Sequence, residues 1–357
     1  MFPTRQNFLP LGRAALLTVA TAVSGLVGSC GQSDLFTPEQ AALVEEVLGM
    51  VQAAPDTVAF EGERLIERFE GDFSTLLTAH TERVQADGQG GFNIDPLQVL
   101  ESGAVSSEEL LIVEDSRIGW NWRYRDFRIR DIDAVLQNYS ILSFGESTTV
   151  AGRVCQHLDV AVAWDPFTIV HSIDVDVQTG LVLRHEILEG QTQLRFRSEY
   201  TSISFTGLEP FVPYTLGTEF EEFTSLGDLQ DDLGFEVGIP RLLPDGFHQQ
   251  SLGKLTDAPG NTWGLVQFTD GIEPLFFLSR PRTDPIGRVP DPKITGFGVS
   301  VAKFDAPVSQ VDANDLMVGR TEGAVALLQA DLGDRRLIAV GRVPMDELRY
   351  WLDSAPR

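Results

Sequence analysis

Strand-like segments separated by turn signals fill most of the first half of the chain. Between Thr57 and Phe205, stretches of alternating apolar and polar residues are interrupted by pairs such as Asp87–Gly88 and Gly90–Gly91. Alternation with a period of two predicts strands that bury one face, and glycine pairs mark tight turns. This region is therefore expected to form one large antiparallel sheet.

A single apolar helix is expected just before this sheet. Thr37 can cap the helix, Pro38 suits its first turn, and Gln40 completes a capping box. The apolar stripe that follows is expected to end before Pro55 and consists of Leu43, Val44, Val47, Leu48 and Val51. A helix with such a face must pack on another element, and the sheet is the expected support.

A hairpin is predicted around Gln178-Thr179-Gly180, because a three-residue loop that ends in glycine suits a left-handed closing residue. The expected pairs are Val177 with Leu181, Val175 with Leu183, and Ile173 with His185. His171 and His185 then become diagonal neighbours on an apolar surface. No nearby residue supplies a third metal ligand, so a buried or cavity-lining role is favoured over metal binding and over a pair that charges on acidification.

The segment Trp120–Arg130 is the most basic part of the chain. As a strand it would place its aromatic and its polar residues on opposite faces, with Trp120, Trp122 and Tyr124 against Asn121, Arg123 and Arg125. Two interpretations stay open: an aromatic core beneath solvated charges, or a dock for an acidic peptide or a lipid headgroup. The candidate partner-binding residues are Arg123, Arg125, Arg128 and Arg130.

The formal charge of the sequence is −25. So acidic a protein repels nucleic acid phosphates and anionic membrane surfaces, and no nucleic acid partner is expected. The chain of 357 residues, 43% of them hydrophobic, is long enough for two globular domains.

The first residues have the pattern of a lipoprotein signal peptide. A short basic start, Met1–Arg13, precedes the uncharged run Ala14–Val27, which is shorter than the roughly 20 residues that span a bilayer. Leu26-Val27-Gly28-Ser29-Cys30 resembles a lipobox, so cleavage before Cys30 and lipidation of Cys30 are expected. An ordinary cleaved signal with an incidental cysteine is the alternative. Because no Asp follows the cysteine, we expect a lipid-anchored protein that faces the periplasm, at the outer membrane.

Cys155 is the one other cysteine in the sequence. With Cys30 acylated it has no intramolecular partner, and a small buried side chain is the expected role.

Three short motifs follow one another in the chain: Asn138-Tyr139, Val150–Arg153 and Asp176–Arg184. Taken in this order, they are similar to the RseB/MucB family of periplasmic stress regulators. In that family, and in the related lipoprotein carriers LolA and LolB, these elements belong to an unclosed, strongly curved sheet whose helix-covered concave face can admit acyl chains. The resemblance thus implies a lipid-binding concavity, with the candidate residues Leu43, Val47, Trp120, Trp122, His171, Ile173, Leu183 and His185.

The second half of the chain resembles the RseB carboxy-terminal domain. The motifs are Phe235–Phe247, Val266–Gly271 with Pro274–Leu278, and a closing strand at Leu337–Pro344. A last helix should follow, with an apolar face of Leu348, Trp351 and Leu352.

These observations predict an α+β protein of two domains. We expect a signal peptide at residues 1–29, a tether at 30–36, a LolA-like half-barrel domain at 37–206, an acidic linker with a short helix at 207–232, and an RseB-type carboxy-terminal domain at 233–357. The first domain is expected to be a curved, unclosed antiparallel β-barrel covered by helices. The second is expected to be a smaller mixed α/β domain, with a mixed sheet and terminal helices.

The sequence contains no Gly-x-Ser-x-Gly, phosphate-binding glycine loop or His-Glu-x-x-His motif. No catalytic residue, cofactor or metal is therefore expected. The leading hypothesis is an envelope-stress regulator in which a lipid or misplaced lipoprotein occupies the concavity and alters contact with an anti-sigma-type membrane protein. A lipid or lipoprotein carrier without a signalling role, and a hydrolase that uses Asp or His on the sheet, are the alternatives.

Overall fold

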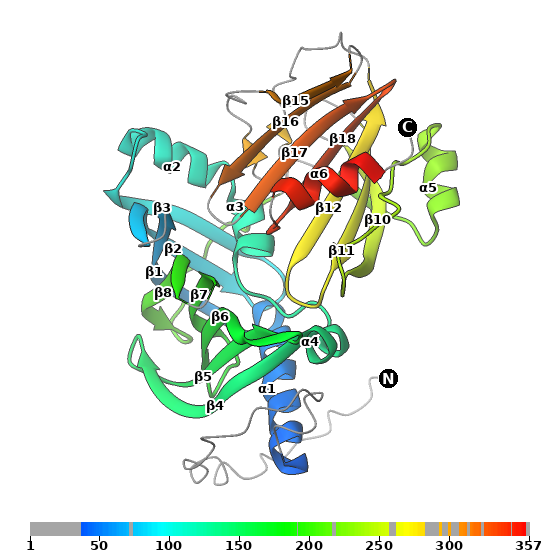
Figure 1. Ribbon diagram of the computed structural model, residues 1–357. Helices are drawn as coiled ribbons and strands as arrows, with labels where there is room; N and C mark the ends of the chain where they lie inside the picture. The colour runs from blue at the N-terminus through cyan, green and yellow to red at the C-terminus, as the bar shows by residue number, and fades with distance from the viewer. Residues whose placement is uncertain are drawn as a thin grey trace, which may run out of the picture.

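Two antiparallel sheets, one above the other in Figure 1, make up the protein. In this computed structural model the described residues are 37–70, 74–190, 192–215, 219–256, 262–282, 293–294, 299–300, 307–312, 315–322, 325–343 and 345–354. The lipobox and Cys30 lie outside these ranges. The expected α+β fold with a large antiparallel sheet that does not close into a barrel is confirmed.

The first sheet has eight strands in the order β3-β2-β1-β8-β7-β6-β5-β4. Each pair is antiparallel, and the two end strands, β3 and β4, are not paired with each other, so the sheet stays open. The strands are β1 (Ala59–Glu70), β2 (Thr75–Asp87), β3 (Phe92–Glu101), β4 (Tyr139–Val150), β5 (Arg153–Val162), β6 (Asp165–Asp176), β7 (Val182–Glu189) and β8 (Gln193–Ser204).

Helix α1 (Pro38–Thr57) packs on the apolar face of this sheet. The capping box is confirmed: the Thr37 hydroxyl accepts from the Gln40 amide at 3.3 Å, and the Thr37 amide donates to the Gln40 side chain at 3.0 Å. The helix continues past Pro55 to Thr57, whereas the buried residues of its apolar stripe, Val44, Val47, Leu48 and Val51, precede the proline. Near a helix end the proline removes a single backbone hydrogen bond, and the last turn tolerates that loss.

The β6–β7 hairpin partly follows its predicted register. Ile173 pairs with His185 as expected, but Val175 pairs with Val182 instead of Leu183 because the register shifts after Asp174. The expected Val177–Leu181 pair is also replaced, since the Asp176 amide donates to the Leu181 carbonyl. The Asp176 carboxylate accepts from the amides of Gln178 and Thr179 and so holds the turn.

The segment after β3 forms short helices. Helices α2 (Ser107–Asp115) and α3 (Ile118–Trp120) lead into the π-helix η2 (Asn121–Arg125), and α4 (Ile132–Asn138) precedes β4. The strand expected at Trp120–Arg130 is therefore wrong. In η2 the aromatic and the basic side chains do not occupy opposite faces, because Trp122 and Arg125 are both buried.

The second sheet has the order β15-β16-β17-β18-β12-β11-β10-β9. Every described pair in it is antiparallel, so the expected mixed sheet is wrong within the described residues. The strands are β9 (Glu219–Glu222), β10 (His248–Thr256), β11 (Thr262–Thr269), β12 (Pro274–Pro281), β15 (Pro307–Asp312), β16 (Asp315–Glu322), β17 (Val325–Leu332) and β18 (Arg335–Gly341); β13 (Lys293–Ile294) and β14 (Val299–Ser300) pair separately.

Helices α5 (Leu226–Leu233) and α6 (Met345–Ser354) complete this half, and α6 lies across the sheet in Figure 1. The apolar face expected for α6 is confirmed, since Leu348, Trp351 and Leu352 are buried in the core of this half. The expected acidic linker does contain the short helix α5. It also contributes strand β9, which is hydrogen-bonded to β10.

Gly180 closes the β6–β7 turn with a φ of 77°, and a Cβ there would lie 2.7 Å from backbone atoms of Met50 in α1. Gly152 has a φ of 73°, and a Cβ built there would have no neighbouring atom within 4 Å. Replacing either glycine by alanine adds left-handed strain of about 1–2 kcal/mol. Gly180→Ala should cost about 1–3 kcal/mol more because it also overpacks the helix contact. Urea unfolding of both variants measures the difference, and equal losses would contradict the close packing of α1 on this turn.

Candidate functional site: the covered cavity and the domain joint

A small cavity lies beneath α1 on the concave face of the first sheet. Its volume is about 50 Å³, roughly a third of the 150 Å³ of an engineered apolar cavity that binds benzene. An acyl chain does not fit without movement of the cover. The lining residues are Val51, Pro55, Phe60, Arg64, Trp122, Asp126, Phe127, Arg128, Gly180, Leu181, Val182, His185, Ser198 and Tyr200.

Two separate elements cover this cavity. Val51 and Pro55 come from α1, whereas Trp122, Phe127 and Arg128 come from residues 118–131, which we call the bridging segment. The Trp122 ring stacks on Phe92 with a centroid distance of 5.0 Å, and the Arg128 guanidinium lies 5.0 Å from the Trp122 ring. The cover is thus held by aromatic and cation–π packing as well as by area burial.

Buried charges bind the bridging segment to strands β1 and β2. Glu82 is fully buried and pairs with Arg64 at 2.7 Å and with Arg125. Arg64 also pairs with Asp126 at 2.9 Å. Burial opposes ionisation of Glu82, but the two arginines overcome it and lower its pKa well below the ordinary value. The charged form therefore prevails, and the segment is pinned to the sheet by charge pairs shielded from water.

Glu114 of α2 extends this ionic network. It lies 2.8 Å from Arg68 and 3.5 Å from Arg125. Burial alone would raise the pKa of Glu114, but Arg68 and the other nearby cations lower it to about 2.

The other side of the bridging segment holds the second sheet. Arg342, just after β18, donates to the carbonyl oxygens of Tyr124 and Arg125 and pairs with Glu273 at 2.9 Å. The amides of Arg130 and Asp131 donate to the Gly271 carbonyl at 2.7 and 3.3 Å. These contacts form the polar part of the domain joint.

Aromatic packing forms the apolar part of the joint. Trp120 and Tyr124 lie 5.8 and 4.5 Å from the ring of Phe276 in β12. Trp120 is buried within the apolar cluster of the second sheet, together with Trp263 of β11. The bridging segment is therefore part of the core of both halves.

The turn between β11 and β12 inserts into the first half of the protein. Ile272 at this turn is buried in the same core cluster as α1 and the first sheet. The Tyr139 hydroxyl donates to the Asp270 carboxylate at 2.6 Å, and the Asn138 side chain donates to the carbonyls of Gly246 and Asp270 at 2.9 Å. Burial raises the pKa of Asp270 to about 6.

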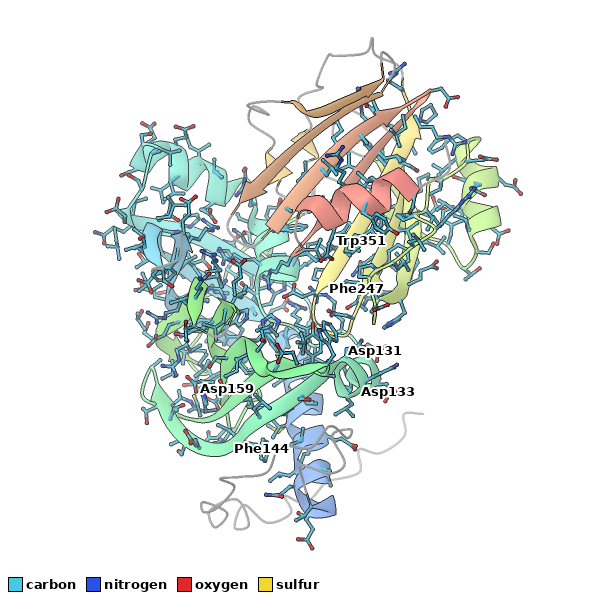
Figure 2. All side chains as sticks on the ribbon, in the orientation of Figure 1. Asp131, Asp133, Phe144, Asp159, Phe247 and Trp351 are labelled. Carbon is cyan, nitrogen blue, oxygen red and sulfur yellow. The ribbon has the colours of Figure 1, made fainter. Side chains whose placement is uncertain are left out.

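Asp131, labelled in Figure 2, marks the boundary between the two halves, where its carboxylate lies 3.1 Å from His248 of β10. A Cβ at Gly271, whose φ is 110°, would lie 2.6 Å from the Val135 amide of α4. Glycine is therefore required for the turn to approach α4 this closely.

His171 and His185 meet as the sequence indicated, with 3.2 Å between His171 Nδ1 and His185 Nε2. Burial lowers the pKa of His171 to about 4, and burial with the neighbouring His171 lowers that of His185 well below its ordinary value. Both rings are therefore neutral at pH 7. In the part of the chain that the structure describes, no cluster of three or more His, Cys, Asp or Glu could hold a metal ion.

The lipid-binding candidates do not lie together in one place. Trp122 and His185 border the cavity. Val47 and Ile173 lie in the core beneath α1, and Leu183 lies in the adjoining core cluster. His171 contacts the second half of the protein through Glu273 at 3.4 Å. Trp120 belongs to the domain joint, and Leu43 is half-buried on α1.

The basic segment is mostly engaged within the protein. Of its four candidate arginines, Arg123 alone is exposed. Arg125 is buried against Glu82, Arg128 stacks on Trp122 and lies 3.6 Å from Asp56, and Arg130 donates to the Arg123 carbonyl. Three of the four side chains thus serve as internal contacts, and a partner-binding role of the set stays a prediction. Cys155 is buried and free, and burial raises the pKa of its thiol to about 11.

Sequence reasoning missed the buried charges and the turn that inserts into the first half. A signal for the charges exists. Arg64 alternates with Phe60 and Ile66 on the buried face of β1, and Glu82 alternates with Val84 on that of β2. Opposite charges in apolar positions of neighbouring strands indicate a buried pair.

Comparison with known proteins supports the motif analysis. The family model described as the MucB/RseB N-terminal domain matches residues 109–221. The resemblance to the RseB/MucB family is confirmed. No curated protein matches the sequence. Among the helices that the structure describes, none is long and apolar enough to cross a membrane.

Three solved structures are similar over most of the chain. A complex of Pseudomonas aeruginosa MucA and MucB has 14% sequence identity and a TM-score of 0.45, and covers 87% of this chain and 98% of its own. MucB alone has 18% identity and a TM-score of 0.45, with 88% and 98% covered. MucB with periplasmic MucA has 13% identity and a TM-score of 0.44, with 87% and 97% covered.

Glu82→Gln tests the buried ionic network. The substitution leaves Arg64 and Arg125 without a buried counter-charge, so the free energy of unfolding should fall by about 3–5 kcal/mol. The control is Glu189→Gln, which breaks a pair between Arg195 and a 66% exposed carboxylate; such a pair is worth about 1 kcal/mol or less. Denaturant titration measures the free energy of unfolding of both variants. Equal losses in the two variants would contradict a role for Glu82 in holding the cover.

His171 should make unfolding pH-dependent. The unfolded chain binds a proton on this residue near pH 6.5, whereas the folded protein does so only near pH 4. The contribution of His171 to the free energy of unfolding is therefore complete above pH 6.5. It is lost as the pH falls towards 4 and amounts to about 3 kcal/mol. His171→Phe should show a shallower decline over this range in chemical denaturation. Parallel curves for the two proteins would show that His171 titrates normally in the fold.

Proposed function

We propose that this protein is a lipid-anchored envelope-stress regulator in which a ligand beneath α1 changes the docking of the two halves and thereby the binding of an anti-sigma-type membrane protein. One observation carries the proposal. The bridging segment lines the cavity through Trp122 and Phe127, and it packs on the second sheet through Trp120 and Tyr124. A ligand that displaces the segment from the cavity therefore also changes its contact with the second sheet.

The small volume of the cavity gives the proposal its mechanism. A chain that enters must displace α1 or the bridging segment, so occupied and empty proteins differ in shape. The apolar part of the lining, such as Val51, Phe60 and Leu181, favours an acyl chain of a lipid or a lipoprotein, at about 0.8 kcal/mol per buried CH₂.

The family match supports the regulatory part of the proposal. The MucB proteins of two of the similar structures are in complex with MucA. By analogy, we propose an anti-sigma-type membrane protein as the partner of this chain and no catalytic activity. The lipobox supports an anchor on Cys30, with the body facing the periplasm at the outer membrane.

A lipid or lipoprotein carrier is the second candidate, because a covered apolar cavity needs no signalling partner. A carrier should release lipid to an acceptor, and its deletion should leave envelope-stress transcription unchanged. A regulator should alter that transcription when it is deleted.

Ile272→Asp is expected to mimic the ligand by expelling the inserted turn from the core of the first half. The variant should lose the membrane partner in affinity purification from envelopes, even without added lipid. Ile112→Asp, at a 62% exposed position of α2, is the control and should behave like the unmodified protein. If Ile272→Asp keeps the partner and its response to lipid, docking does not control partner binding.

A further inference from the structure

A row of polar side chains joins the second sheet to the cavity. Arg342 lies 2.9 Å from Glu273 Oε1, and the same oxygen lies 3.4 Å from His171 Nε2. His171 Nδ1 in turn lies 3.2 Å from His185 Nε2. His185 borders the cavity. The row therefore begins in the domain joint and ends beneath α1.

The charge at the joint fixes the direction of hydrogen bonding along this row. The carboxylate of Glu273 favours a proton on the facing Nε2 of His171, because a lone pair there would be repelled. In a neutral ring the proton on Nε2 leaves Nδ1 of His171 as an acceptor. His185 must then donate to it from its own Nε2. By the same rule, His185 Nδ1 carries a lone pair.

This last nitrogen is an acceptor with no partner among the described residues. His185 is 3% exposed, and its Nδ1 is buried without a hydrogen bond. The rings of Phe127 and Phe196 lie 5.1 and 5.9 Å from the His185 ring and hold it in place. A buried acceptor without a partner is costly, so a donor that reaches it is strongly favoured.

We infer that the cavity binds the neutral hydrogen-bond donor, an O–H or N–H, of a ligand with an apolar chain, and that His185 Nδ1 accepts this hydrogen bond. The inference rests on the proposed function and names its ligand class. The apolar chain contacts the neighbouring lining, such as Phe60 and Leu181.

A carboxylate is disfavoured at this nitrogen, since two acceptors would face each other. The lining holds two arginines, and both are already engaged. Arg64 pairs with Glu82 and Asp126, whereas Arg128 stacks on Trp122 and lies 3.6 Å from Asp56. The Asp126 carboxylate, also in the lining, adds repulsion.

Nitrogen NMR of the full mature chain tests the relay without any ligand. The sequence has five histidines, so ¹⁵N-histidine labelling and single substitutions assign every ring. We expect His171 and His185 to be neutral at pH 7 with the proton on Nε2. A proton on Nδ1 of His185 would overturn the inference.

Ligand pairs that differ by one donor test the specificity. The probes are 1-decanol and decanamide, with decyl methyl ether and decanoate as the compounds that lack a neutral donor. The alcohol and the amide should bind about tenfold or more tightly than the ether, and each should shift the Nδ1 resonance of His185. Tighter binding of 1-decanol than of decanamide indicates a site for a hydroxyl donor, and the reverse order indicates a site for an amide N–H.

His185→Phe should abolish this tenfold difference while leaving weak binding of all four probes. Val154→Thr, at an exposed position of β5, is the control and should preserve the difference. Equal binding of alcohol and ether to the unmodified protein overturns the donor preference but leaves the proposed lipid sensing intact. Failure of every probe to bind overturns both.

Discussion

The bridging segment packs on two sheets at once, and the rest of the structure depends on this double contact. It contacts β1 and β2 through Arg125, where Glu82 lies between Arg64 and Arg125 with almost no access to water. It contacts the second sheet through Trp120 and Tyr124. Buried ion pairs contribute little net stability, but they penalise every misplaced geometry. The segment is thereby restricted to one position, and that position sets the docking of the two halves.

The joint also places the second half inside the first. Ile272 completes the core beneath α1, and Arg342 reaches back to the carbonyls of Tyr124 and Arg125. Neither half keeps its complete core if the two separate. A change of docking must therefore expose apolar surface, unless a ligand fills the space that Ile272 of the β11–β12 turn had occupied. In the proposed function, one apolar occupant replaces another, so a cavity of about 50 Å³ suffices.

The sequence correctly predicted those elements whose conformation is determined by a few neighbouring residues. The capping box of Thr37 and Gln40, the glycine at position 180 and the alternation of the strands each determine a backbone conformation over a few residues. The His171–His185 contact followed from strand periodicity alone, even though the register shift after Asp174 was not foreseen.

Contacts between distant parts of the chain were not visible in the sequence. Trp120–Arg130 alternates like a strand, yet its residues Asn121–Arg125 form a π-helix, and its aromatic and basic residues have partners in both sheets. Two of its arginines, Arg125 and Arg128, pair with Glu82 and Asp56, which lie far away in sequence. The same holds for Ile272, whose pocket is built by α1 and the first sheet.

The distance between the two halves is the most direct measure of the central claim. Spin labels at Leu100→Cys in β3 and Tyr350→Cys in α6, both exposed positions, report it by pulsed electron resonance in a background with Cys30 and Cys155 replaced. The account predicts one narrow distance distribution for the empty protein and a shifted or broadened one with saturating 1-decanol. An unchanged distribution, with the ligand shown to be bound beneath α1, would contradict the coupling of cavity and joint.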